Sequence, residues 1–140
     1  MSLADQYFRP PGEGKAPTAK GHFLDLARDV EPVIFQPGLE FRPAVGQATM
    51  VNSVHFAPHT VAPTHAHDEE QITVVVEGEL EFDLDGDVRL LRPGMVAVIP
   101  ANVPHGARTG EQPCHEYDVF NPPRQALLDL RGRSLPERSS

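Results

Sequence analysis

Short strand-forming segments, separated by turn residues, follow one another along most of this chain. From Ala44 onward, apolar or alternating segments end repeatedly at proline, at glycine or at an Asp-Gly pair. The 15 prolines and 11 glycines among 140 residues disfavour long helices. Strands this short, with turns between them, are typical of a β-sandwich or β-barrel, so we predict an all-β fold.

Five segments carry this prediction. Three of them alternate between apolar and polar residues, as a strand with one buried face does. Two of these three end at a proline. The other two are continuous apolar runs, which we interpret as buried strands. An Asp-Gly pair at 85–86 predicts a hairpin turn between two alternating strands. The five segments are ATMVNSVHFAP (48–58), QITVVVEG (71–78), ELEFDLDGDVRLL (79–91), RPGMVAVIP (92–100) and HEYDVFNPP (115–123).

The chain is short enough for a single domain. Residues 1–20 are rich in Pro, Gly and Lys and lack periodicity, so we expect a flexible N-terminal arm. Residues 21–122 would form the barrel, opening with a short helical turn and a strand on either side of Pro32. Residues 123–140 would form a C-terminal tail that starts as a short helix and then frays.

Charge and composition exclude several classes of partner. The formal net charge of -8 argues against binding to nucleic acid, which needs clustered Lys and Arg, and against anionic membranes. Cys114 is the single cysteine, so no disulfide can form within the chain. No segment resembles a signal peptide or reaches transmembrane length. We therefore expect a cytoplasmic protein.

Histidine spacing points to a metal site. His65 and His67 are two residues apart, so in a strand both side chains would point the same way. Gln71 has the same parity and joins them if the intervening turn preserves the alternation. His105 follows a later strand and could supply a fourth donor. Imidazole nitrogens suit Zn, Fe, Ni, Mn, Co and Cu, whereas a solvated surface turn is the alternative interpretation of the histidine pair.

The last predicted strand could bring acid–base chemistry to the same place. Glu116, Asp118 and Phe120 share one of its faces. If that face lines the barrel, a carboxylate lies in a mainly apolar cup, where its pKa rises and it can serve as a general acid or base. Arg124 follows and could hold a substrate carboxylate. Alternatively the strand is purely architectural, and Arg124 pairs with Asp118 or faces solvent.

Two motifs over residues 44–122 resemble those of cupins. In the first, His65, His67, Gln71 and Gly78 fit the pattern HxH, a glutamate three or four residues later, and a glycine after six more. The second motif has a glycine, a proline, a second glycine, a histidine and an asparagine at fixed spacing. Its positions here are occupied by Gly94, Pro100, Asn102, His105 and Thr109. Gln71, Asn102 and Thr109 depart from the family pattern. Thr109 is not expected to be a ligand.

The resemblance implies a double-stranded β-helix, or jelly-roll, barrel that holds one divalent transition metal ion, either Zn, Ni, Mn, Fe or Co. Its ligands would be His65, His67, Gln71 and His105. With Gln71 in place of glutamate the shell has no anionic ligand, which favours Lewis-acid over redox chemistry. The arrangement DxFxxxR is similar to that of small cupins that linearise unsaturated uronates in pectin and alginate breakdown. Asp118 and Arg124 fall on the positions that act beside the metal there.

Three functional hypotheses follow from the sequence. The first is a metal-dependent enzyme that isomerises, tautomerises or ring-opens a small polar molecule, possibly a sugar acid, with Asp118 and Arg124 as catalytic residues. The second is an Fe- or Mn-dependent dioxygenase, and the third is a non-enzymatic cupin that binds a small molecule. All three predict a small-molecule ligand and no nucleic-acid or membrane partner. An exposed apolar sheet face also predicts a homodimer.

Overall fold

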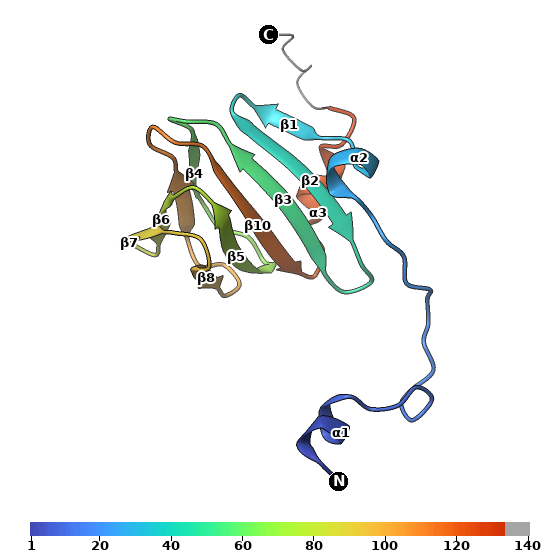
Figure 1. Cartoon of the computed structure of the whole chain (residues 1–140). Helices are drawn as coiled ribbons and strands as arrows, with labels where there is room; N and C mark the ends of the chain where they lie inside the picture. Colours follow the sequence, from blue (N-terminus) through green and yellow to red (C-terminus); the bar gives the residue numbers. More distant parts are fainter. Residues whose placement is uncertain (134–140) are drawn as a thin grey trace.

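The computed structural model describes residues 1–133 and contains ten β-strands and three short helices within them (Figure 1). The strands are β1 (Val33–Gln36), β2 (Leu39–Val45), β3 (Met50–Phe56), β4 (Val61–His65), β5 (Glu70–Glu77), β6 (Leu80–Leu84), β7 (Asp87–Leu91), β8 (Val96–Ile99), β9 (His105–Arg108) and β10 (Cys114–Asn121). The helices are α1 (Leu3–Tyr7), α2 (Leu26–Asp29) and α3 (Gln125–Asp129).

Two antiparallel sheets face each other. The larger has the strand order β1-β2-β3-β10-β5-β8, and the smaller has the order β4-β9-β6-β7. Consecutive strands therefore cross repeatedly between the sheets, as they do in a jelly roll. The prediction of an all-β jelly-roll barrel is confirmed.

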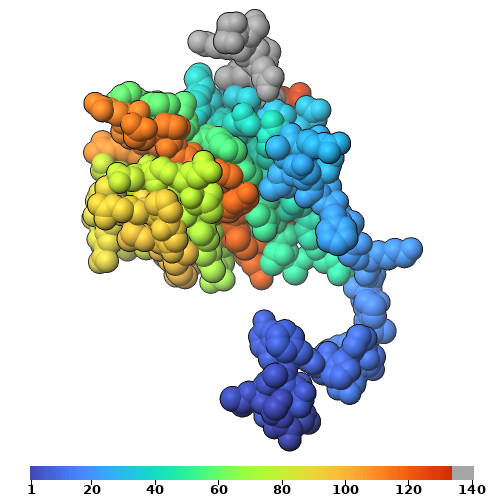
Figure 2. All heavy atoms as spheres, in the orientation of Figure 1, coloured from blue at the N-terminus to red at the C-terminus, as the bar shows by residue number. Residues whose placement is uncertain are grey.

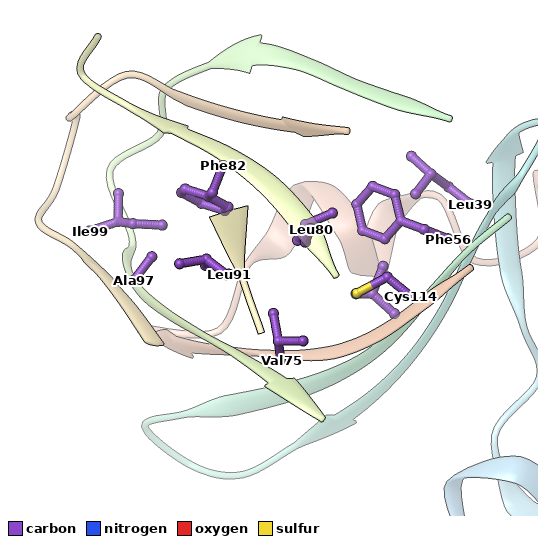
Figure 3. Packing of buried hydrophobic residues seen from close by; sticks show 10 residues of the cluster. Leu39, Phe56, Val75, Leu80, Phe82, Leu91, Ala97, Ile99 and Cys114 are labelled. Carbon is purple, nitrogen blue, oxygen red and sulfur yellow. The ribbon is translucent and has the colours of Figure 1, made fainter. Parts of the chain in front are cut away.

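The core fills the space between the two sheets. Figure 3 shows apolar side chains from both sheets pointing into this space. Alternation along each strand explains the arrangement: in β10 every second residue from Cys114 to Phe120 is buried, while the residues between them are half-buried. The buried cluster consists of Leu39, Val54, Phe56, Val75, Leu80, Phe82, Leu91, Ala97, Ile99 and Cys114.

Turn residues adopt the conformations that the sequence predicts. Asp85 and Gly86 have φ values of 50° and 90° and join β6 to β7 as a two-residue hairpin. Asn102 stands where most cupins carry glycine, and its φ of 65° is one that asparagine tolerates. The Asn102 backbone N–H donates to the carbonyl of His67 at 2.8 Å. The turn of the second motif therefore holds the first motif in place.

One prediction about burial was wrong. The apolar runs of β5 and β8 were expected to be buried strands, but each has one exposed or half-buried face. Val98 is 54% exposed and Ile72 is 36% exposed. Helix α2 contacts the outer face of the larger sheet at β2, where Arg42 donates to the carbonyls of Ala27 and Val30, but the outer faces of β5 and β8 remain exposed or half-buried. An apolar run alone cannot distinguish a strand buried on both faces from one buried on a single face.

Most of the N-terminal segment lies apart from the barrel. Residues 1–25 are exposed, and Figures 1 and 2 show the start of the chain, with α1, away from the sheets. Nearer the barrel, Thr18 Oγ1 donates to Gln47 Oε1 at 3.1 Å, and His22 and Leu24 border β2 and β3.

The sequence analysis missed helix α1 within the N-terminal arm, which begins with a capping box formed by Ser2 and Asp5. The flexibility of the arm stays a prediction. At the other end α3 is the expected short helix, while the predicted fraying of residues 134–140 lies outside the described residues.

None of the helices in residues 1–133 has both the length and the apolar character that crossing a membrane requires.

Gly78 in the first cupin motif should tolerate no side chain. Its φ is 76°, and a Cβ atom there would lie 2.1 Å from the carbonyl oxygen of Pro113. Gly78→Ala should lower the free energy of unfolding by about 2–4 kcal/mol, measured by urea denaturation. Gly86→Ala is the matched control, since its φ is 90° but no atom lies within 4 Å of the added Cβ. It should cost only about 1 kcal/mol. Equal losses in both variants would contradict the steric argument.

Candidate metal centre

Three histidines converge inside one end of the barrel. His65 ends β4 and pairs in register with His105, which begins β9. His67 lies in the turn before β5. One ring nitrogen of each imidazole lies within 4.8 Å of the others, which is close enough for a shared metal ion. The structure thus brings together the three histidines that the sequence analysis singled out.

Backbone hydrogen bonds orient all three rings. Each Nδ1 lies close to the carbonyl oxygen of a residue two positions away: Pro63 at 2.7 Å from His65, Glu69 at 2.9 Å from His67, and Val103 at 2.9 Å from His105. A carbonyl oxygen only accepts, so each Nδ1 carries the proton and each Nε2 keeps its lone pair. Three Nε2 lone pairs are therefore available on the cavity side.

Gln71 completes the set of donors. Its amide N–H group donates to Thr73 Oγ1 at 2.8 Å and to Asp118 Oδ1 at 3.1 Å. Its Oε1 therefore points the other way and lies 3.0 Å from His67 Nε2. Two lone pairs face each other in this contact, an arrangement that a cation between or beside them would stabilise. The Nε2 atom of His105 is buried without a hydrogen-bond partner in residues 1–133.

Burial keeps His67 and His105 neutral. It lowers the pKa of His67, with a further lowering by the nearby Arg124 guanidinium. It also lowers the pKa of His105 to about 4. Only a neutral imidazole can bind a metal ion, so both rings are in the required state at neutral pH. Three imidazole nitrogens and one amide oxygen fit a divalent transition metal.

The histidines line a cavity of about 320 Å³ between the two sheets. Most of its wall is apolar, with side chains from both sheets and from α3, and its polar groups gather around the histidines and on β10. A volume of this size accommodates a monosaccharide or a comparably small molecule. Polar groups confined to one side of an apolar cup would orient such a ligand.

Asp118 lies directly beside the donor set. It is 8% exposed, and its Oδ1 accepts hydrogen bonds from Thr73 Oγ1 at 2.8 Å and from Gln71. Burial raises the pKa of Asp118, although these hydrogen bonds oppose the rise. Glu116 faces the same cavity, and its pKa is raised well above the usual range by burial and by the neighbouring Asp118 carboxylate. Asp118 is therefore the member of this pair that ionises first.

Arg124 lines the same cavity. The two predicted alternatives to a substrate clamp were a pair with Asp118 and a side chain in solvent, and neither applies. Its Nη1 lies 3.3 Å from Glu69 Oε1, and its side chain is 25% exposed. Glu69 Oε1 also lies 3.5 Å from His67 Nδ1. Arg124 is thus fixed near the histidines by Glu69, not by Asp118, and is neither buried nor fully in solvent.

Sequence reasoning missed several features of this site. His67 does not belong to a strand, so strand alternation does not explain its direction; the turn between β4 and β5 does. Glu69 carried no signal as a partner of Arg124. Glu116 was placed on the same strand face as Asp118 but was given no role of its own. Alternation along residues 50–56 does not tell which face of β3 lines the cavity, and the structure places Asn52 in the cavity wall.

Fold, histidine triad and cavity together define a cupin. Residues 52–120 match the family described as cupin domain. The chain is also 32% identical over 80 residues to the pectin degradation protein KdgF of Dickeya dadantii (strain 3937). This match covers 56% of the chain and 73% of that protein. The chain belongs to the cupin family.

Two further proteins are similar to this chain. The structure of KdgF from Halomonas sp. superimposes with a TM-score of 0.72 at 30% identity, covering 77% of this chain and 99% of that one. The H2HPP isomerase of Bacillus subtilis is 45% identical over 53 residues, which is 36% of this chain. The chain spans only 22% of that isomerase, so the match is confined to part of it.

The low pKa of His105 should make the metal-free protein sensitive to acid. Unfolding returns the imidazole to a pKa of about 6.5, so the unfolded chain takes up a proton that the folded chain refuses. Stability should therefore fall as the pH drops from about 6.5 towards 4, by at most about 1.4 kcal/mol per pH unit from this group.

Urea denaturation at several pH values measures this effect, after metal has been removed by a chelator. The free energy of unfolding is compared between wild type and His105→Gln at each pH. The variant lacks the group and should show a shallower decline. His22→Gln, which removes an exposed histidine of the N-terminal arm, should decline as the wild type does. A wild-type slope equal to that of His105→Gln would contradict the assignment.

Proposed function

We propose that this cupin is a metal-dependent enzyme that opens or isomerises the ring of a small sugar acid. The observation that carries the proposal is the hydrogen bond from Gln71 Nε2 to Asp118 Oδ1, because it places a buried carboxylate beside the metal donors. The similarity to KdgF, a protein named for pectin degradation, supports a uronate as substrate. The similarity to an isomerase over part of the chain supports the reaction class.

We propose His65, His67, Gln71 and His105 as the metal ligands. A divalent ion bound there would act as a Lewis acid towards a substrate oxygen. The neutral donor set supports this chemistry over oxygen activation, since a shell without a carboxylate stabilises a trivalent ion less well. The residue roles that follow concern only the side chains of the chain itself.

For a 4,5-unsaturated uronate in its ring form, these side chains can be assigned the following steps. Asp118 can take the proton of the C1 hydroxyl while the bond between C1 and the ring oxygen breaks, leaving an aldehyde at C1 and an enolate at C5. Asp118 then returns the proton to C4, which converts the enolate to a ketone. The net change is an isomerisation, so no oxidant or reductant is needed. A raised pKa suits a carboxylate that both accepts and donates a proton.

Arg124 would hold the substrate carboxylate. Its Nη1 is bound to Glu69, but the guanidinium offers further N–H groups, and its side chain lines the cavity. A planar guanidinium binds a carboxylate through two parallel hydrogen bonds. The sugar acid would thus be fixed at its anionic end while its ring reaches Asp118.

Asp118→Asn should abolish turnover without removing the metal. The amide oxygen of asparagine can still accept from Thr73 and Gln71, so the donor set keeps its geometry, whereas the proton carrier is lost. We expect kcat to fall about 10²–10⁴-fold. The assay follows the loss of ultraviolet absorbance of the conjugated double bond in unsaturated galacturonate, and elemental analysis measures bound metal.

His65→Ala is the matched control and should lose both metal and activity. Loss of metal in Asp118→Asn would show that Asp118 is structural. Turnover of wild type at full rate without oxygen is also expected, and consumption of oxygen with substrate would instead support a dioxygenase. A sugar acid that binds tightly and is recovered unchanged would support a non-enzymatic binding protein.

We also propose that two copies of the chain associate through the outer face of the larger sheet. Strand register places Val51, Val119, Ile72 and Val98 in one row across β3, β10, β5 and β8. A contiguous apolar row on an otherwise charged protein favours a partner with the same surface. A second copy offers that surface by two-fold symmetry.

Val98→Glu should shift the protein from dimer to monomer in sedimentation velocity. In a two-fold interface each copy contributes the same substitution, so two added charges have to be buried at the interface. Val88→Glu is the matched control, since Val88 is 52% exposed against 54% for Val98 but lies on β7 of the other sheet. A wild-type monomer, or a dimer unaffected by Val98→Glu, would contradict the proposal.

A further inference from the structure

Besides His105 Nε2, two polar atoms in the cavity have no hydrogen-bond partner within residues 1–133. The side-chain oxygen of Asn52 and Oε2 of Glu116 make no hydrogen bond there. Asn52 is 2% exposed and Glu116 is 3% exposed, so bulk water does not compensate for the missing partners. Buried polar groups are rarely left unpaired in folded proteins, because an unmade hydrogen bond destabilises the fold. Both residues line the cavity that contains the histidines.

Strand register fixes where these two groups lie. Asn52 is directly opposite Asp118 on the neighbouring strand, on the side away from Thr73. Glu116 precedes Asp118 by two residues on the same face of β10, about 7 Å along the strand. Gln71 pairs with Phe120, which follows Asp118 by two residues. Gln71 and Glu116 therefore lie on opposite sides of Asp118 along the strand direction. The two unpartnered groups therefore border Asp118 on sides that the metal donors do not occupy.

Apart from Asp118, whose side chain is hydrogen-bonded to that of Glu116, the neighbours of these groups are apolar. Val54 and Val75 are the strand neighbours of Glu116, and both are fully buried apolar residues. The rest of this part of the cavity wall includes Phe56, Leu80 and Phe82. Only a molecule inside the cavity could therefore complete the hydrogen bonds.

The chemistry of the pair specifies the ligand group. The amide of Asn52 can accept and donate. Burial and the neighbouring Asp118 carboxylate raise the pKa of Glu116 well above its usual range, and its carboxyl group is hydrogen-bonded to Asp118, which leaves Oε2 as a free acceptor. A hydroxyl group donates one hydrogen bond and accepts others, whereas an anionic group would be repelled by nearby Asp118. Neutral hydroxyls are thus the matching partners.

We propose that Asn52 and Glu116 form a hydroxyl-binding subsite that makes the cavity selective for polyhydroxylated ring acids over equally large acids without hydroxyls. The inference rests on the proposed function, because it assumes that a ring acid enters this cavity. Arg124 would hold the carboxylate at one end, and the subsite would hold ring hydroxyls beyond Asp118. Two anchoring points on either side of Asp118 fix the orientation of the ring towards that carboxylate.

The test measures binding of two stable probes by isothermal titration calorimetry, using the full chain with the metal it carries when purified. D-Galacturonate has the ring hydroxyls but no 4,5 double bond, and cyclohexanecarboxylate has a ring of the same size without hydroxyls. Wild type should bind D-galacturonate at least about tenfold more tightly than cyclohexanecarboxylate. Asn52→Leu and Glu116→Leu should each weaken D-galacturonate binding about 5- to 10-fold and leave cyclohexanecarboxylate binding unchanged.

Two further variants separate the subsite from a structural effect. Glu116→Gln keeps a donor and an acceptor and should restore most of the affinity. Ser53→Ala changes the neighbour of Asn52 on the outer face of β3, where Ser53 contacts His115, and should leave both affinities unchanged. Equal affinity of wild type for the two probes, no binding of D-galacturonate, or equal losses for both probes in the Leu variants would overturn the subsite.

Neither probe has the 4,5 double bond that the proposed ring opening converts to a ketone, so binding of the probes is measured separately from that reaction. Selective D-galacturonate binding together with no conversion of unsaturated galacturonate would leave the subsite standing and overturn the proposed ring opening. Conversion of unsaturated galacturonate together with equal affinity for the two probes would support the proposed ring opening and overturn the subsite.

Discussion

The side-chain amide of Gln71 determines how the two halves of the site face each other. An amide has donors at one end and an acceptor at the other, so fixing one end fixes both. Here the N–H group is held by Thr73 and Asp118, and the oxygen is turned towards His67 Nε2. A glutamate at this position could not donate to Asp118. The substitution that distinguishes this chain from the usual cupin pattern therefore couples a buried carboxylate to the metal donors.

The barrel supplies the conditions under which these groups are useful. Backbone carbonyls orient the three imidazoles, so no rearrangement is needed before a metal binds. Burial keeps His105 neutral and raises the pKa of Asp118. Both pKa shifts arise because burial disfavours the charged form of a group. Burial therefore lowers the pKa of a base and raises the pKa of an acid. An apolar cavity with a few polar groups on one side thus prepares ligands and proton carrier together.

Alternation and turn chemistry predicted much of the fold. The Asp85–Gly86 hairpin, the strand ending before the two prolines after Asn121, and the short helix beyond them lie where expected. Strands β2, β4 and β9 were not recognised as separate elements, because their segments carry weak apolar patterns. The outer face of β5 and β8 was mistaken for core, since apolar residues in sequence do not reveal which faces another layer covers.

The sequence by itself determined which residues could form the site. Spacing marked His65, His67, Gln71 and His105, and strand parity marked Asp118. Local pattern suffices for these residues because turns and alternation act over a few positions. Only the tertiary structure decided what surrounds them. The contact of Arg124 with Glu69 joins residues 55 positions apart, and Asn52 meets Asp118 across paired strands from distant segments. Such contacts depend on strand order and register, which long-range packing sets and no local pattern specifies.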